Sequence, residues 1–463
     1  MTDNDFSVYA LRVKNLVLSI YTPGIKLCGG RTIFKRNGRL FQFMNVLFDI
    51  STLGIAHSLE FLKTGIFRVV ENLAIGLYEA DNCNITFCAS HYNYKNCRDF
   101  FDSHPVFSEY AFSQPDKGLS SFFNYMEPLR LQISKSNQNN WKTPFRRIYH
   151  WGKKFAEPIN EKDIQTANIF HSPFLPIPRQ IIQNKRIKKF ITIHDLTALI
   201  HPEYYPSSTV EFMKIILGSI KPDTFVTCVS ESTRQDFLAY MPSFAPARAS
   251  VVYLAAGGNF YCCQDQELIA QTGRKYRIPV GSPYFMALST LNPNKNFERI
   301  INSFIRMVKE NPLKDLHLVL VGASGWNSER IFKEAENSGE IAKRIILTGY
   351  VADEDLAPLY SGALAFLFPS LYEGFGLPPL EAMKCGTPVI TSNNSSLPEV
   401  VGDAAITINP RDEDALCQAM LDVYKSEPLR KKLSALSLER AKMFNWEKTT
   451  RESITAYKQA LST

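Results

Sequence analysis

The sequence contains no apolar run that approaches the ~18 residues needed to span a bilayer. Its first residues, Met1 to Asp5, are polar and acidic rather than basic and then apolar. We therefore expect neither a membrane-spanning helix nor a secretory signal peptide. Nine cysteines are present, and none of them forms a C-x-x-C pair. An odd number of cysteines without metal-ligand spacing favours reduced, buried thiols in a cytoplasmic protein.

Several ligand-binding patterns are also missing. No G-x-G-x-x-G follows a first strand, which disfavours an NAD-dependent dehydrogenase built from two Rossmann domains. The Asp-x-Asp triplet at 353–355 is expected to begin a helix, and none stands at a strand end where it would hold a metal. We therefore expect no catalytic metal and no cofactor. No basic motif has a geometry that indicates nucleic-acid binding.

Charge is divided unevenly along the 463 residues. Residues 279–463 carry 20 Lys and Arg against 22 Asp and Glu, a net charge of −2. Because the whole chain carries +7, residues 1–278 carry +9, which suggests contact with an anionic partner. Residues 141–155 interleave cations with aromatics, as in segments that contact an anionic membrane surface. A solvated basic face with its aromatics packed inward is the alternative for this stretch.

The most informative segment lies between a buried strand and a helix. The apolar run 363–368 predicts the strand, and residues 380–384 predict a helix that ends at a Cys-Gly pair. Gly374 lies in the turn between them, where open α/β sheets bind ligands and where a helix N-terminus favours an anion such as a diphosphate. Glu373 and Glu381 flank this turn, and their carboxylates can accept hydrogen bonds from the hydroxyls of a sugar or a ribose.

Residues 368–383 resemble the E-x7-E signature of the retaining glycosyltransferases of family 4, also called glycosyl transferases group 1, which have the GT-B fold. The resemblance extends from about residue 45 to about residue 460, and its N-terminal motifs are most similar to mannosyltransferase-like members that build bacterial surface polysaccharides. The other matching segments are 63–68, 170–173, 192–197, 202–204, 229–233, 291–296, 318–322, 346–351, 386–392, 395–405 and 409–410.

The resemblance implies an α/β protein of two Rossmann-like domains, each a doubly wound parallel sheet, facing each other across a cleft. We expect an N-terminal extension (1–40), an acceptor-binding domain (41–278), a nucleotide-sugar-binding domain (279–444) and a C-terminal helix that crosses back to the first domain (445–463). Hydrophobic periodicity supports this with predicted strands at 43–50, 190–193, 224–229, 251–254, 284–288, 317–321, 345–347 and 363–368.

The resemblance also assigns roles to residues. Lys295 would neutralise the leaving diphosphate, Glu373 and His194 would contact the donor sugar near the reacting centre, and Glu381, on the first turn of its helix, would hold the ribose hydroxyls. The acceptor is expected to attack on the face that the diphosphate leaves, so we nominate no general base. The residues predicted to bind the donor are Gly65, Arg68, Gly322, Gly349, Tyr350, Gly374, Phe375, Gly376, Leu377 and Glu381.

The chain departs from the family pattern at the phosphate-binding turn. Asn294 stands where an arginine is usual, and Ser289 stands where a glycine is usual. Phosphate clamping is therefore expected to be weaker, or to be supplied by another cation such as Arg68.

The predicted activity is the transfer of a sugar, best matched by mannose from GDP-mannose, to a saccharide or lipid-linked saccharide acceptor in surface polysaccharide or lipopolysaccharide synthesis. The expected location is the cytoplasm, with peripheral contact at the inner face of the membrane. One alternative is a non-catalytic GT-B partner subunit, which would be expected to lose Glu373, Lys295 or His194. Another is a different GT-B enzyme, such as a nucleotide-sugar epimerase or a phosphorylase.

Overall fold

The computed structural model describes residues 44–58, 65–89, 94–114, 159–290, 292–311, 313, 315–322 and 339–463, together with the backbone of three short N-terminal strands. The basic and aromatic stretch 141–155, predicted to contact a membrane, lies outside the described residues. Within them, no helix is both long and apolar enough to cross a membrane.

The first half of the chain forms a six-stranded parallel sheet in the order β5-β4-β6-β7-β8-β9. Its strands are rich in buried Val, Ile and Phe, as expected of a sheet covered by helices on both faces. The strands are β4 (Met44–Asp49), β5 (Cys83–Cys88), β6 (Ile169–Ser172), β7 (Lys188–Ile193), β8 (Thr224–Cys228) and β9 (Ala249–Val251). The helices are α2 (Ser51–Ser58), α3 (Gly65–Glu79), α4 (Tyr94–Ser103), α7 (Glu161–Thr166), α8 (Arg179–Gln183), α9 (Thr197–Ile200), α10 (Ser207–Gly218) and α11 (Glu231–Tyr240).

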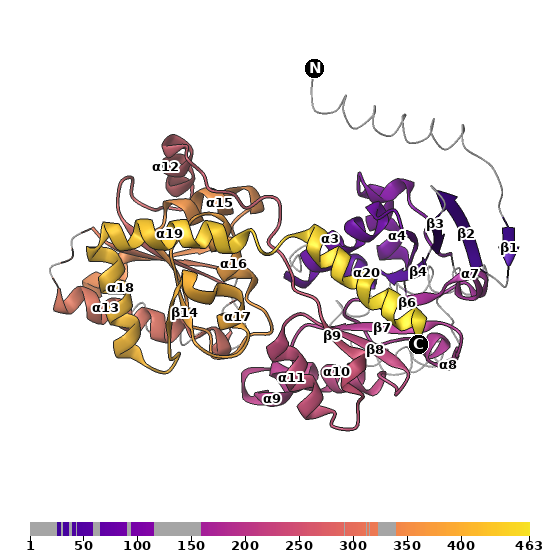
Figure 1. Cartoon of the computed structure of the whole chain (residues 1–463). Helices are drawn as coiled ribbons and strands as arrows, with labels where there is room; N and C mark the ends of the chain where they lie inside the picture. Colours follow the sequence, from indigo (N-terminus) through magenta and orange to yellow (C-terminus); the bar gives the residue numbers. More distant parts are fainter. Residues whose placement is uncertain are drawn as a thin grey trace, which may run out of the picture.

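The second half forms another six-stranded parallel sheet, in the order β12-β11-β10-β13-β14-β15. Both sheets are doubly wound, which confirms the fold class expected from the sequence (Figure 1). The strands are β10 (Tyr284–Leu288), β11 (His317–Val321), β12 (Ile345–Gly349), β13 (Ala365–Phe368), β14 (Val389–Ser392) and β15 (Ile406–Ile408). The helices are α12 (Gln266–Lys275), α13 (Phe297–Glu310), α15 (Asp353–Gly362), α16 (Leu377–Lys384), α17 (Leu397–Val401), α18 (Glu413–Lys425) and α19 (Glu427–Ala441).

The last helix, α20 (Trp446–Ser462), follows α19 in the second half and lies against the first half (Figure 1). It packs on α3, where a Cβ added to Gly76 would lie 2.2 Å from the hydroxyl oxygen of Thr450. The hydroxyl of Tyr457 lies 2.5 Å from Nδ1 of the buried His171 at the end of β6. The two halves are therefore joined by α20 as well as by the chain between β9 and β10.

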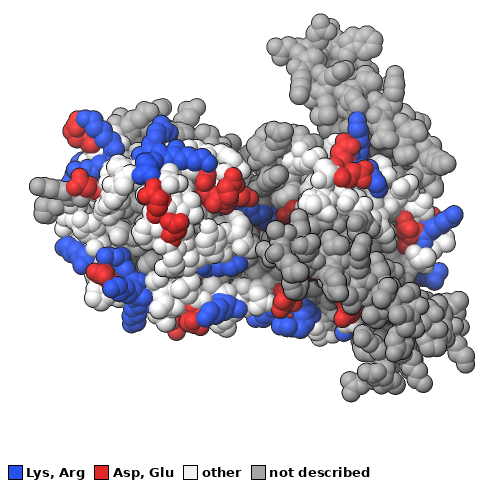
Figure 2. Space-filling view, turned by 90° about the horizontal axis from the view of Figure 1, so that it is seen from above, with Lys and Arg blue, Asp and Glu red and all other residues white. Residues whose placement is uncertain are grey.

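Three short strands, for which no strand was predicted, begin within the predicted N-terminal extension (1–40). A separate antiparallel sheet is formed by β1 (Lys26–Cys28), β2 (Arg31–Arg36) and β3 (Arg39–Gln42). These strands are short and contain no more than two consecutive apolar residues, so they lack the continuous apolar run that made β4 easy to identify. On the surface seen in Figure 2, basic and acidic side chains are interspersed over both halves of the described molecule.

Candidate active site

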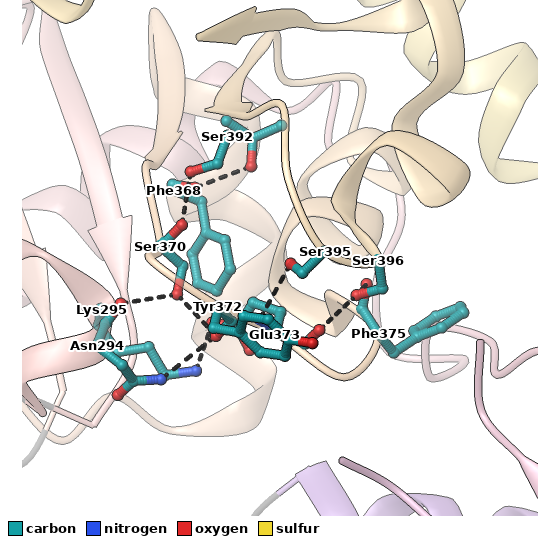
Figure 3. A network of polar contacts seen from close by, with 11 residues as sticks. Asn294, Lys295, Phe368, Ser370, Tyr372, Glu373, Phe375, Ser392, Ser395 and Ser396 are labelled. Atoms are coloured by element: carbon teal, nitrogen blue, oxygen red, sulfur yellow. Dashed lines mark hydrogen bonds and ion pairs between the residues drawn. The ribbon is translucent and has the colours of Figure 1, made fainter. Parts of the chain in front are cut away.

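The loop between β13 and α16, residues 369–376, is held in shape by hydroxyl groups (Figure 3). Ser370 donates a hydrogen bond to the Asn294 carbonyl at 2.9 Å. Ser396 donates to the carbonyls of Glu373 and Phe375 at 3.0 and 2.8 Å. The loop is thus fixed from both sides before α16 begins.

Lys295 and Glu373 form an ion pair across this loop, with Nζ 2.6 Å from Oε1. Both side chains are mostly buried, with 18 and 12% of their surfaces exposed. Lys295 ends a short turn (η5, Pro293–Lys295), and the next residue, Asn296, has a left-handed backbone with φ of 62°. The side-chain Nδ2 of Asn296 donates to the Pro369 carbonyl at 2.9 Å, which ties the turn to the β13–α16 loop. The structure therefore brings two predicted catalytic residues together.

Asn294, which replaces the usual arginine, is buried under the loop rather than exposed to the cleft. Its carbonyl accepts from the Leu371 amide at 2.8 Å, and its side-chain Nδ2 donates to the Tyr372 carbonyl at 3.5 Å. Asn294 thus supports the loop that carries Glu373 and supplies no charge for a phosphate. Lys295 is the cation that this turn offers.

His194 reaches the same place from the first half of the chain. A Cβ added to Gly374 would lie 1.9 Å from the His194 carbonyl oxygen, so only glycine permits this approach. The His194 ring is 2.8 Å from the Pro173 carbonyl through Nε2. Burial lowers the pKa of His194, which favours the neutral ring. The third predicted catalytic residue therefore lies directly against the loop that begins at Pro369.

Glu381 lies inside α16 and pairs with the other half of the molecule. Its carboxylate is 3.3 Å from the Arg68 guanidinium, which also lies 2.5 Å from Asp353, and it accepts a hydrogen bond from Tyr360 at 3.4 Å. Burial raises the pKa of Glu381 to about 7, although Arg68 opposes this shift. The predicted first-turn position is wrong: α16 begins at Leu377, because proline is well accepted in the first turn of a helix.

The remaining predicted donor residues also lie at the carboxyl ends of strands or helix starts. A Cβ added to Gly65 would lie 3.2 Å from the Leu377 side chain, so these two meet across the halves. The Gly322 amide donates to the Gly349 carbonyl at 3.0 Å, which joins the ends of β11 and β12. Tyr350 is 74% exposed beside them.

The last two predicted donor residues, Phe375 and Gly376, end the loop before α16. The Phe375 side chain is buried against Tyr253 and Phe444, so only its backbone can approach a ligand. Gly376 has φ of 111° and precedes α16, a conformation that a residue with a Cβ rarely adopts.

Sequence reasoning missed contacts made by Asp353, Ser230, Thr233 and Glu399. Asp353 holds Arg68, and the other three connect α11 to the second half. Ser230 is the N-cap of α11. Its contact with the second half joins residues 144 positions apart, which no local pattern encodes.

Comparison with known proteins bears on this site. Residues 270–438 match the family described as Glycosyl transferases group 1. The chain is 33% identical over 291 residues to the O-antigen chain mannosyltransferase B of Escherichia coli, an alignment that covers 63% of this chain and 74% of that protein. It is 30% identical over 336 residues to the serotype-specific mannosyltransferase WbdA of Escherichia coli, covering 69% of this chain but only 40% of that protein.

The fold has solved counterparts. A sucrose-phosphate synthase from Thermosynechococcus elongatus superposes with a TM-score of 0.58 at 16% identity, covering 90% of this chain and 99% of that one. This similarity concerns the fold alone, and it confirms the predicted GT-B arrangement of two facing Rossmann-like domains.

Proposed function

The chain belongs to the glycosyl transferases group 1 family, and we propose that this glycosyltransferase moves mannose from GDP-mannose to a saccharide or lipid-linked saccharide acceptor. The names of its relatives support the choice of mannose and of a surface polysaccharide as product. Retention of the anomeric configuration, a cytoplasmic site of action and peripheral contact with the inner face of the membrane are parts of the same proposal. No metal or cofactor enters the proposed reaction.

The observation that carries the proposal is the meeting of groups from both halves at one loop. His194 comes from the first half, and Lys295 and Glu373 come from the second. When the bond to the leaving diphosphate breaks, negative charge grows on its oxygens, and a cation already in place stabilises that charge. The Lys295 ammonium meets this requirement, since Glu373 and the Asn296 turn hold it at the loop.

Glu373 and His194 are proposed to orient the donor sugar. The Glu373 carboxylate can accept hydrogen bonds from sugar hydroxyls while its other contact remains with Lys295. The neutral His194 ring can accept or donate one hydrogen bond without adding charge beside the positively charged transition state. The departing phosphate would take the acceptor proton, so neither side chain has to act as a base.

Glu381 is proposed to bind the ribose, and this requires an exchange of partners. Its carboxylate is satisfied by Arg68 and Tyr360, and ribose hydroxyls would replace the Arg68 contact. Asp353 lies 2.5 Å from the same guanidinium and can retain it during the exchange. The other guanidinium nitrogen, Nη1, would then be available to the diphosphate, which compensates for the asparagine at position 294 where an arginine is usual.

A nucleotide panel tests this proposal. Thermal shifts would be measured with GDP, UDP, dTDP, ADP and NAD on the wild type and on Glu381→Ala, because a ligand that binds the folded state raises its melting temperature. A shift with GDP that is lost in the variant supports both the base and the ribose contact. A shift with NAD and with no nucleoside diphosphate would refute the glycosyltransferase site as described. Incubation with GDP-mannose and NMR of the product linkage then test the sugar and the retention of configuration.

A further inference from the structure

We propose that Ser230, Thr233 and Glu399 form a clamp that positions the Glu373–Gly374 backbone against the first half of the molecule. Ser230 and Thr233 lie at the N-terminus of α11, and Glu399 lies in α17 on the opposite side. The inference rests on the proposed function, since it assigns these three as positioning residues for the Glu373 site. None of them was among the residues expected to contact a substrate.

The first half of the clamp is a pair of hydroxyls on one carbonyl. Ser230 Oγ donates to the Gly374 carbonyl at 2.6 Å, and Thr233 Oγ1 donates to the same oxygen at 3.0 Å. All three residues are buried, so this carbonyl depends on protein donors for its hydrogen bonds. The Gly374–Phe375 peptide unit, one residue beyond Glu373, is therefore held by two side chains of the other domain.

In the second part of the clamp, a side chain of the second domain accepts hydrogen bonds from the backbone of the first domain. The two carboxylate oxygens of Glu399 accept from the backbone amides of Glu231 and Ser232, each at 2.9 Å. The first amides of a helix lack partners within the helix, and a carboxylate there also meets the positive end of the helix dipole. Glu399 further accepts from the Tyr253 hydroxyl at 3.0 Å.

The residues in both parts of the clamp are themselves held in place by further hydrogen bonds. Ser230 is also the N-cap of α11, because its Oγ accepts from the Thr233 amide at 3.0 Å. The backbone around Glu399 is fixed by Arg440 of α19, which donates to the Glu399 and Val400 carbonyls at 2.6 and 2.9 Å. The N-terminus of α11 is thus hydrogen-bonded to two elements of the second domain, α17 and the loop that carries Glu373.

The consequence for the reaction is positional. The His194 carbonyl oxygen lies close to Gly374, but this steric contact does not prevent the loop from moving away from the first domain. The clamp supplies the attraction that the steric contact lacks. It holds Glu373 and its partner Lys295 at a fixed separation from the first domain, as preorganised groups must be if they are to stabilise a transition state.

The test compares isosteric variants in the full chain. Thr233→Val removes one donor to Gly374 and keeps the volume, while Thr233→Ser keeps the hydroxyl. Glu399→Gln keeps the shape but loses one acceptor for the α11 amides. Thr455→Val is the matched control, because its hydroxyl donates to the Arg451 carbonyl of its own helix on an exposed face. Hydrogen–deuterium exchange of residues 371–377 is measured without any substrate.

We expect exchange in 371–377 to rise several-fold in Thr233→Val and Glu399→Gln, while Thr233→Ser and Thr455→Val match the wild type. With GDP-mannose, kcat should fall about three- to tenfold, the effect of one buried hydrogen bond, with a smaller change in KM. The core strand β10 serves as the reference for overall stability. If β10 exchanges as in the wild type and exchange of residues 371–377 is also unchanged in both Thr233→Val and Glu399→Gln, the clamp is overturned. If exchange rises but the wild type transfers no sugar, the proposed function fails and the clamp stands.

Discussion

The Lys295 ammonium and the Glu373 carboxylate lie 2.6 Å apart in surroundings that leave less than a fifth of either side chain exposed. Neither charge can be well hydrated there, so each is the main partner of the other. A diphosphate that enters the site brings the negative charge that Lys295 can share with Glu373. The Lys295 ammonium therefore has two sets of partners: the Glu373 carboxylate alone in the free protein, and the carboxylate together with a phosphate when the donor is bound.

The first prediction concerns the cation. Lys295→Met should lower the affinity for GDP by about tenfold or more, because a charge-assisted hydrogen bond to the phosphate is lost. Lys295→Arg should retain most of the affinity. Calorimetric titration with GDP and with guanosine separates the phosphate contribution from the rest. Equal losses for GDP and guanosine would contradict a phosphate role, since guanosine has no phosphate to contact.

The second prediction uses the raised pKa of Glu381. The pKa is about 7 in the folded chain against 4.5 for an ordinary glutamate, mainly because of burial. Between these two values the unfolded chain has released the proton and the folded chain has kept it. The contribution of Glu381 to the free energy of unfolding therefore falls as pH rises from 4.5 to 7. Glu381→Gln should remove this slope, which urea titrations at a series of pH values would measure.

The same ionisation affects the donor. Ribose hydroxyls donate to the ionised carboxylate, so GDP affinity should rise about tenfold between pH 6 and pH 8 through this group. The phosphate of GDP titrates in the same range, and the rise is therefore taken as the difference between the wild type and Glu381→Gln. Arg68→Met should shift the midpoint to higher pH, because Arg68 is the group that opposes the raised pKa. An identical pH dependence in wild type and Glu381→Gln would exclude the ribose contact.

The third prediction separates folding from closure. Gly374→Ala would place a Cβ 1.9 Å from the His194 carbonyl oxygen, a backbone atom that cannot turn away. We expect sugar transfer to fall by at least about a hundredfold, the cost of misplacing reacting groups by an ångström, while both sheets stay folded. Gly218→Ala is the control, because nothing lies within 4 Å of its added Cβ. Circular dichroism and kcat/KM decide the outcome: a folded Gly374→Ala with normal kcat/KM would show that the contact is not needed.

The sequence was sufficient to predict the central strands of the second sheet and the turn that carries Glu373. The apolar run at 317–321 and the strand at 284–288 appear in the structure with the same bounds, because buried parallel strands are continuous apolar runs with polar flanks. The Glu373 turn could be found for a similar reason, since the two glycines that permit close approach lie only two positions apart in the chain.

The sequence was insufficient for contacts between the two domains. Arg68 meets Glu381 across 313 positions, and Ser230 meets Gly374 across 144. Periodicity reports which face of an element is buried but not which distant residue covers it. The burial of Asn294 also could not be foreseen, since the same polar residue is equally acceptable at an exposed turn.

The last prediction concerns the attachment of α20 to the first domain. Burial lowers the pKa of His171 to about 3, so its ring is neutral at pH 7, with one nitrogen 2.5 Å from the Tyr457 hydroxyl and the other 2.8 Å from that of Thr192. Tyr457→Phe keeps the ring packing but leaves one nitrogen of a fully buried histidine without a partner, at a cost of about 1–3 kcal/mol. Urea unfolding measures this loss.

Tyr240→Phe is the control for the substitution itself, because Tyr240 is 46% exposed at the end of α11. A loss in Tyr457→Phe no larger than in Tyr240→Phe would show that α20 is held by apolar packing alone. A larger loss, accompanied by faster amide exchange in 446–462 than in 427–441, would place the weakened contact at α20. Since the packing of α20 on the first domain joins the two domains in addition to the chain between β9 and β10, that variant should also transfer sugar more slowly even though no substrate contact has been changed.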